Sequence, residues 1–356
     1  MDLHIHIWTN LEYFDLLNKW KLLSSWKKDR DLASFFMWNF PWELAESISP
    51  QYEINFMWIR EIKKKLWTNI FDKISGIYYG SDNCEFLAPT KNEIEKAIEK
   101  FREFNKNFPP HKIRTFTLVT PYVWDKMLER LEEWLEFLNN LKIKNPIEVV
   151  VNDFWILNLL NKKYKNLKIS IGRLLHKQLK TPLVDTYWYE AHPAWELIKN
   201  KNEQEKIRLR KEIVKWQMKF YNSAEVWNPI YKWFLSKLLV DRVAIDYMQN
   251  REELFKNVNS DEIWIDLYYP WALIFTGRLC DTSAIDNPAR GYYATDDICP
   301  RTCNKYDIFY KIKTIWYKML QRWNAWYRSE LNLDFLDENF TKNKKNRLIF
   351  SPFISV

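Results

Sequence analysis

Residues 147–171 read IEVVVNDFWILNLLNKKYKNLKISI, and this stretch contains one complete repeat of the fold. The mostly apolar run at 147–151 is typical of a buried strand, residues 153–161 are typical of a helix, and residues 168–171 predict a second strand. A strand, a helix and another strand in this order favour a parallel pair, because the helix carries the chain back across the sheet.

The same alternation extends through the chain on both sides of this stretch. Apolar residues recur at spacings of three and four over 124–141, which indicates a one-sided helix. Further helices are expected at 11–20, 91–105 and 251–255. The predicted strands cover 3–8, 76–79, 113–119, 147–151, 168–171, 242–245, 263–268 and 347–350. Eight such units predict an α/β fold, a TIM-barrel-like parallel barrel formed by a single domain over residues 1–356.

Two Trp-rich segments interrupt the repeat and are expected to be helical insertions. The first, 21–70, is an insertion or a cap, and the second covers 186–239. An alternative places the first strand at 52–58, with the N-terminal residues as an added cap, and the sequence leaves both open. Residues 311–337 are expected to form another long helical stretch. The chain has 20 tryptophans, whose large apolar area favours packing on the barrel or on a partner.

Composition limits the possible partners and compartment. The net charge of +8 is modest, and lysines alternate with glutamates as they do on solvated faces, so nucleic-acid binding is disfavoured but stays open. No apolar run of roughly 18 residues predicts a membrane span. The N-terminal residues do not resemble a signal peptide. We therefore expect a cytoplasmic protein with reduced thiols.

Polar residues follow several predicted strands, where the active sites of such barrels lie. Imidazole titrates near neutral pH, and an Arg with a Lys can clamp a carboxylate, which suggests roles for some of these residues. The alternatives are structural. Asp153 would cap the following helix, His176 would be a hydrogen-bonded histidine of the core, and Arg173 and Lys177 would form ion pairs that fix the loop. The catalytic candidates are Asp153, His176 and Asp246, and the substrate-binding candidates are Asn152, Arg173, Lys177 and Gln178.

The chain has only four cysteines: Cys84, Cys280, Cys299 and Cys303. Cys84 follows a predicted strand, and the other three lie close together near the C-terminus. Four thiolates complete the coordination of a 4Fe-4S cluster or of a structural zinc ion. Zinc sites usually use Cys-x-x-Cys pairs, whereas three residues separate the one close pair here. The pattern therefore favours iron-sulfur over zinc and over unligated thiols.

Five motifs in a fixed order give the chain a resemblance to a known family. The set resembles the PrtC-type collagenase-like peptidase family, and within it the UbiV-like branch. The likeness covers residues 76–185 and 240–306, about half of the chain. The motifs are Asp-Asn-Cys at 82–84, Val-Asn-Asp at 151–153, Ile-Gly-Arg-Leu-Leu-His-Lys-Gln at 171–178, Gly-Arg-Leu-Cys at 277–280 and Ile-Cys-Pro-Arg-Thr-Cys at 298–303.

The resemblance implies a TIM-barrel-like fold that holds a 4Fe-4S cluster through all four cysteines. It further implies oxygen-independent hydroxylation, of ubiquinone precursors or of RNA bases in this family, and here we expect an aromatic or quinone-precursor substrate. Prephenate is the implied oxygen donor in several branches, and a paralogous family member is the implied partner in a heterodimer. The chain departs from the family in its two Trp-rich insertions and in the long gap between Cys280 and Cys299.

Two other functions stay open at this point. A collagenase-like peptidase would need a nucleophile or a hydrolytic metal with an open position, and no convincing serine or histidine arrangement is present. A non-catalytic iron-sulfur subunit would use its Trp-rich insertions to bind a partner.

Overall fold

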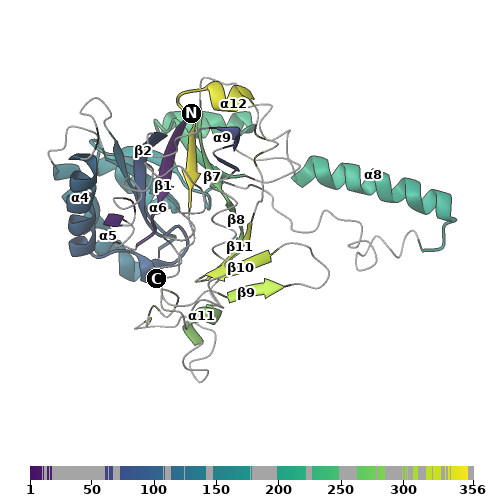
Figure 1. Ribbon diagram of the computed structural model, residues 1–356, viewed down its shortest axis with the longest axis horizontal. Coiled ribbons are helices and arrows are strands. Elements are labelled where there is room, and N and C mark those ends of the chain that lie inside the picture. The colour runs from purple at the N-terminus through teal and green to yellow at the C-terminus, as the bar shows by residue number, and fades with distance from the viewer. Residues whose placement is uncertain are drawn as a thin grey trace.

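The structure is a computed structural model (Figure 1), and part of the chain is described in it. The described residues are 1–9, 11, 14–15, 17, 61–62, 64–66, 73–106, 108, 114–123, 125–141, 147–176, 178, 199–221, 227–247, 263–277, 280–284, 299, 301, 303, 308–311, 318–322, 324–329, 333, 336 and 338–351.

Eight parallel strands form a closed barrel, which confirms the predicted TIM-barrel-like fold. Around the barrel the order is β1-β12-β7-β6-β5-β4-β3-β2. Every predicted strand is present, with small shifts at the ends. The strands are β1 (Asp2–His6), β2 (Ile74–Gly80), β3 (Thr115–Val119), β4 (Glu148–Val151), β5 (Lys168–Ile171), β6 (Arg242–Asp246), β7 (Trp264–Tyr269) and β12 (Arg347–Phe350). Because β1 is the first barrel strand, the alternative that began the barrel at 52–58 is wrong; residues 52–58 themselves lie outside the described residues.

Alternation along the strands separates two apolar layers. One layer fills the barrel interior and consists of Tyr78, Val119, Val150, Ala244, Tyr268 and Ile349. The other faces the surrounding helices and includes Leu3, Ile77, Leu118 and Val149. The barrel therefore provides a packed support rather than a pore.

A charged network closes the end of the barrel where the strands begin. Arg242 Nη1 lies 2.6 Å from Asp266 Oδ1, and Tyr78 donates a hydrogen bond of 2.7 Å to Asp266. Arg347 pairs with Glu148 in the same network. Two arginines thus balance two carboxylates, which suits a structural role at this end.

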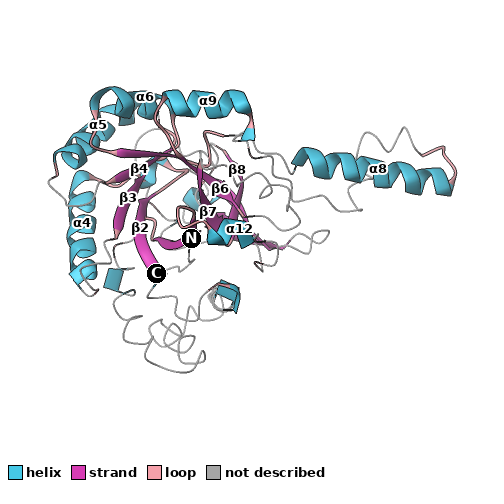
Figure 2. Ribbon diagram, turned by 90° about the horizontal axis from the view of Figure 1, so that it is seen from above, coloured by secondary structure: helices cyan, strands magenta, loops and turns pink. Residues whose placement is uncertain are grey.

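Described helices cover part of the outside of the barrel (Figure 2). The predicted helices at 91–105, 124–141 and 153–161 correspond to α4 (Lys91–Lys106), α5 (Asp125–Asn140) and α6 (Phe154–Lys163). Short α12 (Glu338–Lys342) precedes the last strand. The helix predicted at 251–255 lies outside the described residues, and of the one at 11–20 only Phe14, Asp15 and Leu17 are described as helical.

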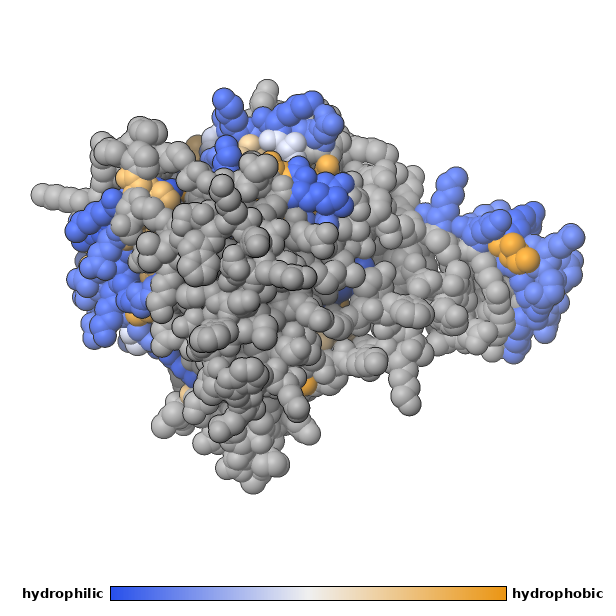
Figure 3. Space-filling view, viewed as in Figure 1, coloured by the Kyte–Doolittle hydropathy of each residue, from blue (hydrophilic) through white to orange (hydrophobic). Residues whose placement is uncertain are grey.

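The second predicted insertion contains two helices. Helix α9 (Pro229–Lys237) packs on the barrel through the buried Leu235, whereas α8 (Glu203–Tyr221) extends away from it (Figures 1 and 2). The described side chains visible over α4, α8 and α12 are mainly hydrophilic (Figure 3). Of the first insertion, 21–70, only residues 61–62 and 64–66 are described, and Glu61, Ile62, Lys64 and Lys65 are helical.

A second sheet follows β7 and corrects the expectation of a helical stretch at 311–337. It is antiparallel, with the order β8-β11-β10-β9. The spacing of apolar residues over 311–337 suits a helix locally. The structure is decided instead by the pairing of β11 with the distant β8, and aromatic residues pack well in strands. The strands are β8 (Trp271–Thr276), β9 (Ile308–Lys311), β10 (Lys318–Arg322) and β11 (Ala325–Ser329).

Candidate functional site

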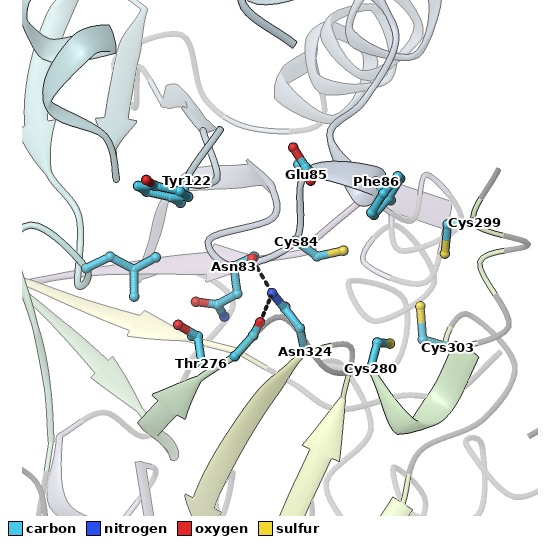
Figure 4. A pocket seen from close by; sticks show the side chains of 12 residues that line it. Asn83, Cys84, Glu85, Phe86, Tyr122, Thr276, Cys280, Cys299, Cys303 and Asn324 are labelled. Atoms are coloured by element: carbon cyan, nitrogen blue, oxygen red, sulfur yellow. Dashed lines mark hydrogen bonds between the residues drawn. The ribbon is translucent and has the colours of Figure 1, made fainter. Parts of the chain in front are cut away.

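All four cysteines line one cavity of about 410 Å³ (Figure 4). The cysteine side chains gather on one side of it, while Tyr122 and Thr276 lie on the other. The complete lining consists of Asn83, Cys84, Glu85, Phe86, Tyr122, Leu174, Thr276, Gly277, Cys280, Cys299, Cys303 and Asn324. The fold thus brings Cys84 to the three C-terminal cysteines, as the sequence predicted.

Cys84 is positioned by the turn that ends β2. Gly80 has a φ of 127°, in the region that favours glycine, and a Cβ atom there would lie 2.1 Å from the carbonyl oxygen of Val119. Beyond it, Ser81 Oγ accepts a hydrogen bond of 3.2 Å from the backbone N–H of Cys84. Burial, and then the neighbouring Cys280, raise the pKa of Cys84 to about 12.

Cys280 lies directly before the short helix α11 (Asp281–Ala284). Its carbonyl oxygen accepts hydrogen bonds from the backbone N–H of Ser283 at 3.0 Å and from Ser283 Oγ at 2.7 Å. Its Sγ lies 3.0 Å from Thr282 Oγ1. Burial raises the pKa of Cys280 as well. Both buried thiols are therefore protonated at neutral pH unless a metal replaces their protons.

Arg301 joins the loop of Cys299 and Cys303 to the loop of Cys84. Its Nε donates a hydrogen bond of 3.0 Å to the carbonyl oxygen of Phe86, in the 3-10 helix η3 (Glu85–Leu87). Its Nη1 lies 3.4 Å from Glu93 Oε1, in the first turn of α4. These contacts hold together two segments that are far apart in the sequence, because Arg301 lies 215 positions after Phe86.

The donor set consists of four thiols that line one cavity. None of the four cysteines forms a disulfide. Within the described part of the chain, no group of three or more His, Cys, Asp or Glu residues is close enough to hold one metal ion. Tetrahedral zinc with Zn–S bonds of about 2.3 Å needs its sulfurs about 3.8 Å apart. A 4Fe-4S cluster is also held by four thiolates, so the number of donors suits either group.

Arg173, a predicted substrate-binding residue, is paired with two buried carboxylates. Its Nη1 lies 2.7 Å from Asp246 Oδ1, and its Nη2 pairs with Asp82. Its guanidinium also lies over the ring of Tyr268, 3.9 Å from the centroid. Burial opposes the charge, but Asp82 and Asp246 raise the pKa of Arg173 well above its usual value. The charge of Arg173 is therefore neutralised within the protein.

The other predicted residues after β4 and β5 make structural contacts. Asn152 donates to the carbonyl oxygen of Thr120 at 2.8 Å, and its Oδ1 accepts from the N–H of Leu174 at 3.1 Å. Gln178 bonds both the carbonyl oxygen and the N–H of Asp246, at 2.8 and 2.9 Å. These bonds fix the loop after β5 to its two neighbouring strands.

His176 and Asp153 also make structural contacts. His176 is buried and its Nε2 bonds the carbonyl oxygen of Ala244. Asp153 caps α6, because its carboxylate accepts from the N–H of Trp155 at 2.7 Å. Lys177 lies outside the described residues. The six described candidates surround the mouth of the barrel and none lines the cysteine cavity, so their catalytic and binding roles stay predictions.

Eight lining residues were not among the predicted site residues: Asn83, Glu85, Phe86, Tyr122, Leu174, Thr276, Gly277 and Asn324. Tyr122 could have been found, because it follows the end of β3 just as the named candidates follow other strands. Asn83 lies between Asp82 and Cys84 of a quoted motif, and its side chain donates to Tyr327 Oη at 2.5 Å. Thr276 and Asn324 carried no signal, because they belong to the second sheet, part of which was expected to be helical.

Among the described helices, none is both long enough and apolar enough to cross a membrane. No protein-family model matches the chain, and neither does any curated protein or solved structure.

Proposed function

We propose that this protein holds a 4Fe-4S cluster and acts in oxygen-independent hydroxylation of an aromatic or quinone-precursor substrate, in the manner of the UbiV-like branch that its motifs resemble. The observation that carries the proposal is the shared cavity of Cys84, Cys280, Cys299 and Cys303. These are all the cysteines of the chain, and they come from segments far apart in the sequence.

The surrounding residues support the cysteines as ligands. When bound, the cluster would supply one-electron redox chemistry. Thr282 lies within hydrogen-bonding distance of Cys280 Sγ, and bonds of this kind tune a cluster. Arg301 adds positive charge near the four thiolates. Its hydrogen bond to Phe86 also fixes the loop of Cys299 and Cys303 to the loop of Cys84. The raised pKa values of Cys84 and Cys280 disfavour these two thiols as nucleophiles.

The side of the cavity opposite the cysteines suits a small aromatic molecule. Tyr122 is 58% exposed, Thr276 lies on the same side of the cavity (Figure 4), and Leu174 also lines it. A planar ring can stack on the tyrosine next to the cluster position. No Lys or Arg occurs among the described residues that line the cavity, so prephenate as the oxygen donor is supported by the resemblance alone.

Anaerobic purification tests the cofactor. We expect a coloured protein with equal amounts of iron and acid-labile sulfide. Zinc without sulfide, or protein with no metal after anaerobic reconstitution, would overturn the proposal.

Anaerobic incubation then tests the reaction. The loaded protein, alone and with a co-expressed paralogue, is mixed with prephenate and a ubiquinone precursor, and mass spectrometry detects the gain of one oxygen atom. Size-exclusion chromatography of the same two samples tests the proposed heterodimer. A loaded protein that transfers no oxygen in either sample would instead be a non-catalytic iron-sulfur subunit.

Replacing Tyr122 with alanine should weaken substrate binding while leaving the iron content unchanged. An aromatic pair contributes about 0.5–1.5 kcal/mol beyond its buried area, which corresponds to roughly a two- to tenfold rise in KM. Tyr122→Phe is the matched control and should behave like the unmodified protein. An unchanged KM in Tyr122→Ala would place the substrate elsewhere.

Replacing Arg301 with alanine should speed the loss of iron to a chelator. The variant lacks both the hydrogen bond to the carbonyl oxygen of Phe86 and the pair with Glu93. Hydrogen bonds from charged groups contribute about 1.5–3 kcal/mol, so release should be at least tenfold faster. Arg102→Ala, on the exposed face of α4, is the control. Equal release rates in the two variants would show that Arg301 does not secure the loop.

A further inference from the structure

Two asparagines that line the cysteine cavity each carry an oxygen that accepts no hydrogen bond. Asn83 directly precedes Cys84, and Asn324 lies between β10 and β11. Figure 4 shows both between the cysteines and the side of the cavity with Tyr122 and Thr276. The Oδ1 atoms of both asparagines are buried, and neither has a hydrogen-bond partner among the described residues. Buried acceptors are almost always paired, so these two oxygens point to a donor from outside the protein.

The contacts of Asn324 fix the orientation of its amide group. Its Nδ2 donates to the carbonyl oxygen of Gly277 at 2.8 Å and to the carbonyl oxygen of Asn83 at 3.1 Å (Figure 4). A carbonyl oxygen accepts but does not donate, so the amide nitrogen has to face both of them. The remaining polar atom of the side chain is therefore Oδ1, which can only accept a hydrogen bond.

The Asn83 side chain is also held in place by its nitrogen. Asn83 is only 4% exposed, and its Nδ2 donates to Tyr327 Oη of β11 at 2.5 Å. Figure 4 shows the amide turned toward the side of the cavity where Thr276 lies. In both asparagines the protein thus uses the nitrogen to fix the side chain and leaves the oxygen as an acceptor for a group in the cavity.

The other lining residues restrict the chemistry of that group. No Lys or Arg lines the cavity among the described residues, so an anionic group would find no cation there. A metal cation such as Ca²⁺ takes six to eight oxygen ligands, and the side chain of Glu85 points away from both asparagines (Figure 4). Two neutral amide oxygens suit a neutral O–H or N–H donor, and the exposed ring of Tyr122 beside them suits an aromatic ligand.

We propose that Asn83 and Asn324 determine specificity by accepting hydrogen bonds from an O–H or N–H group on an aromatic ligand. A ligand whose donor is blocked by a methyl group would leave both oxygens unpaired. Sites built to bond a hydroxyl or an amine reject analogues of this kind strongly. The inference rests on the proposed function for the place of the ligand in the cysteine cavity, but it does not depend on which metal the cysteines hold.

Ligand-observed NMR titration of the anaerobically purified full-length chain tests the inference without turnover. The probes are phenol and aniline, each compared with its methylated counterpart, anisole or N,N-dimethylaniline. We expect each donor to bind at least about tenfold more tightly than its counterpart. Equal affinities within both pairs would mean that water alone satisfies the two oxygens and would overturn the inference, and so would the absence of binding by phenol and aniline.

Two variants locate the contact. Asn83→Leu has a side chain of similar size without an acceptor, so its affinity for phenol should fall to its affinity for anisole. Tyr327→Phe removes the hydroxyl that Asn83 Nδ2 contacts but leaves Oδ1, and this matched control should keep the preference for phenol. Thermal melting checks that both variants fold. The ratio of the two affinities is insensitive to a partly unfolded fraction, and an unchanged ratio in Asn83→Leu would refute the assignment.

Iron and acid-labile sulfide, measured on the same samples, separate this inference from the proposed function. A protein that prefers phenol but takes up no cluster would contradict the proposed function and support the acceptor role of Asn83 and Asn324. A protein with a complete cluster that binds phenol and anisole equally would do the opposite.

Discussion

Cys84→Ala should leave the anaerobically purified protein with almost no 4Fe-4S cluster. Cys84 supplies the one candidate ligand from the N-terminal part of the chain, and its thiol faces the same cavity as the other three. Three remaining thiols cannot close the coordination of all four irons, and a small side chain in this buried position gives no replacement ligand. The measurement is iron and acid-labile sulfide per chain, with Cys303→Ala made in parallel.

A matched control separates loss of a ligand from disturbance of the loop. Thr282→Val keeps all four cysteines but removes the hydroxyl that lies 3.0 Å from Cys280 Sγ. This variant should retain iron and sulfide, with a shifted reduction potential because hydrogen bonds to sulfur tune the cluster. If Cys84→Ala retained iron and sulfide at the unmodified level while folding normally, Cys84 would not be a ligand and the cavity would need another explanation.

The barrel could be predicted because each of its units repeats one local pattern. The strand at 147–151 and the helix after it carry their own signals, namely an apolar run and a cap at Asp153. The second sheet could not be predicted, because β11 pairs with β8 across about fifty intervening residues. The spacing of apolar residues in β11 does not reveal that partner. Propensity within a short window says little about pairing at such distances.

The candidate site shows the same division between local and long-range information. The grouping of the four cysteines could be predicted from their number and from the motifs around them. The surroundings of Arg173 could not, because Asp82 and Asp246 are 91 and 73 residues away from it. The rim position left open both a clamp for a substrate carboxylate and an ion pair that fixes the loop, and only the fold shows that Asp82 and Asp246 pair with Arg173. Side-chain pairing across a barrel mouth depends on the closure of the whole barrel.

Arg173→Met should therefore lower the free energy of unfolding, rather than affect substrate binding alone. The substitution leaves the carboxylates of Asp82 and Asp246 buried without the cation that they share. Breaking such a buried group by removing one partner costs about 3–5 kcal/mol. Urea denaturation of the metal-free protein measures this loss directly, and iron content should fall as well, because Asp82 belongs to the same loop as Cys84.

A second variant tests whether the carboxylates cause this loss. Arg173→Met combined with Asp82→Asn and Asp246→Asn removes all three charges, and should recover part of the stability because no uncompensated charge remains buried. A substrate-binding Arg173 predicts a different pattern: the single variant would unfold at the same urea concentration as the unmodified protein but would show a raised KM. Since the arginine's side chain is only 1% exposed and touches both carboxylates, we expect the stability change to dominate. A denaturation midpoint unaffected by Arg173→Met would restore the sequence interpretation of this residue as a clamp for a carboxylate substrate.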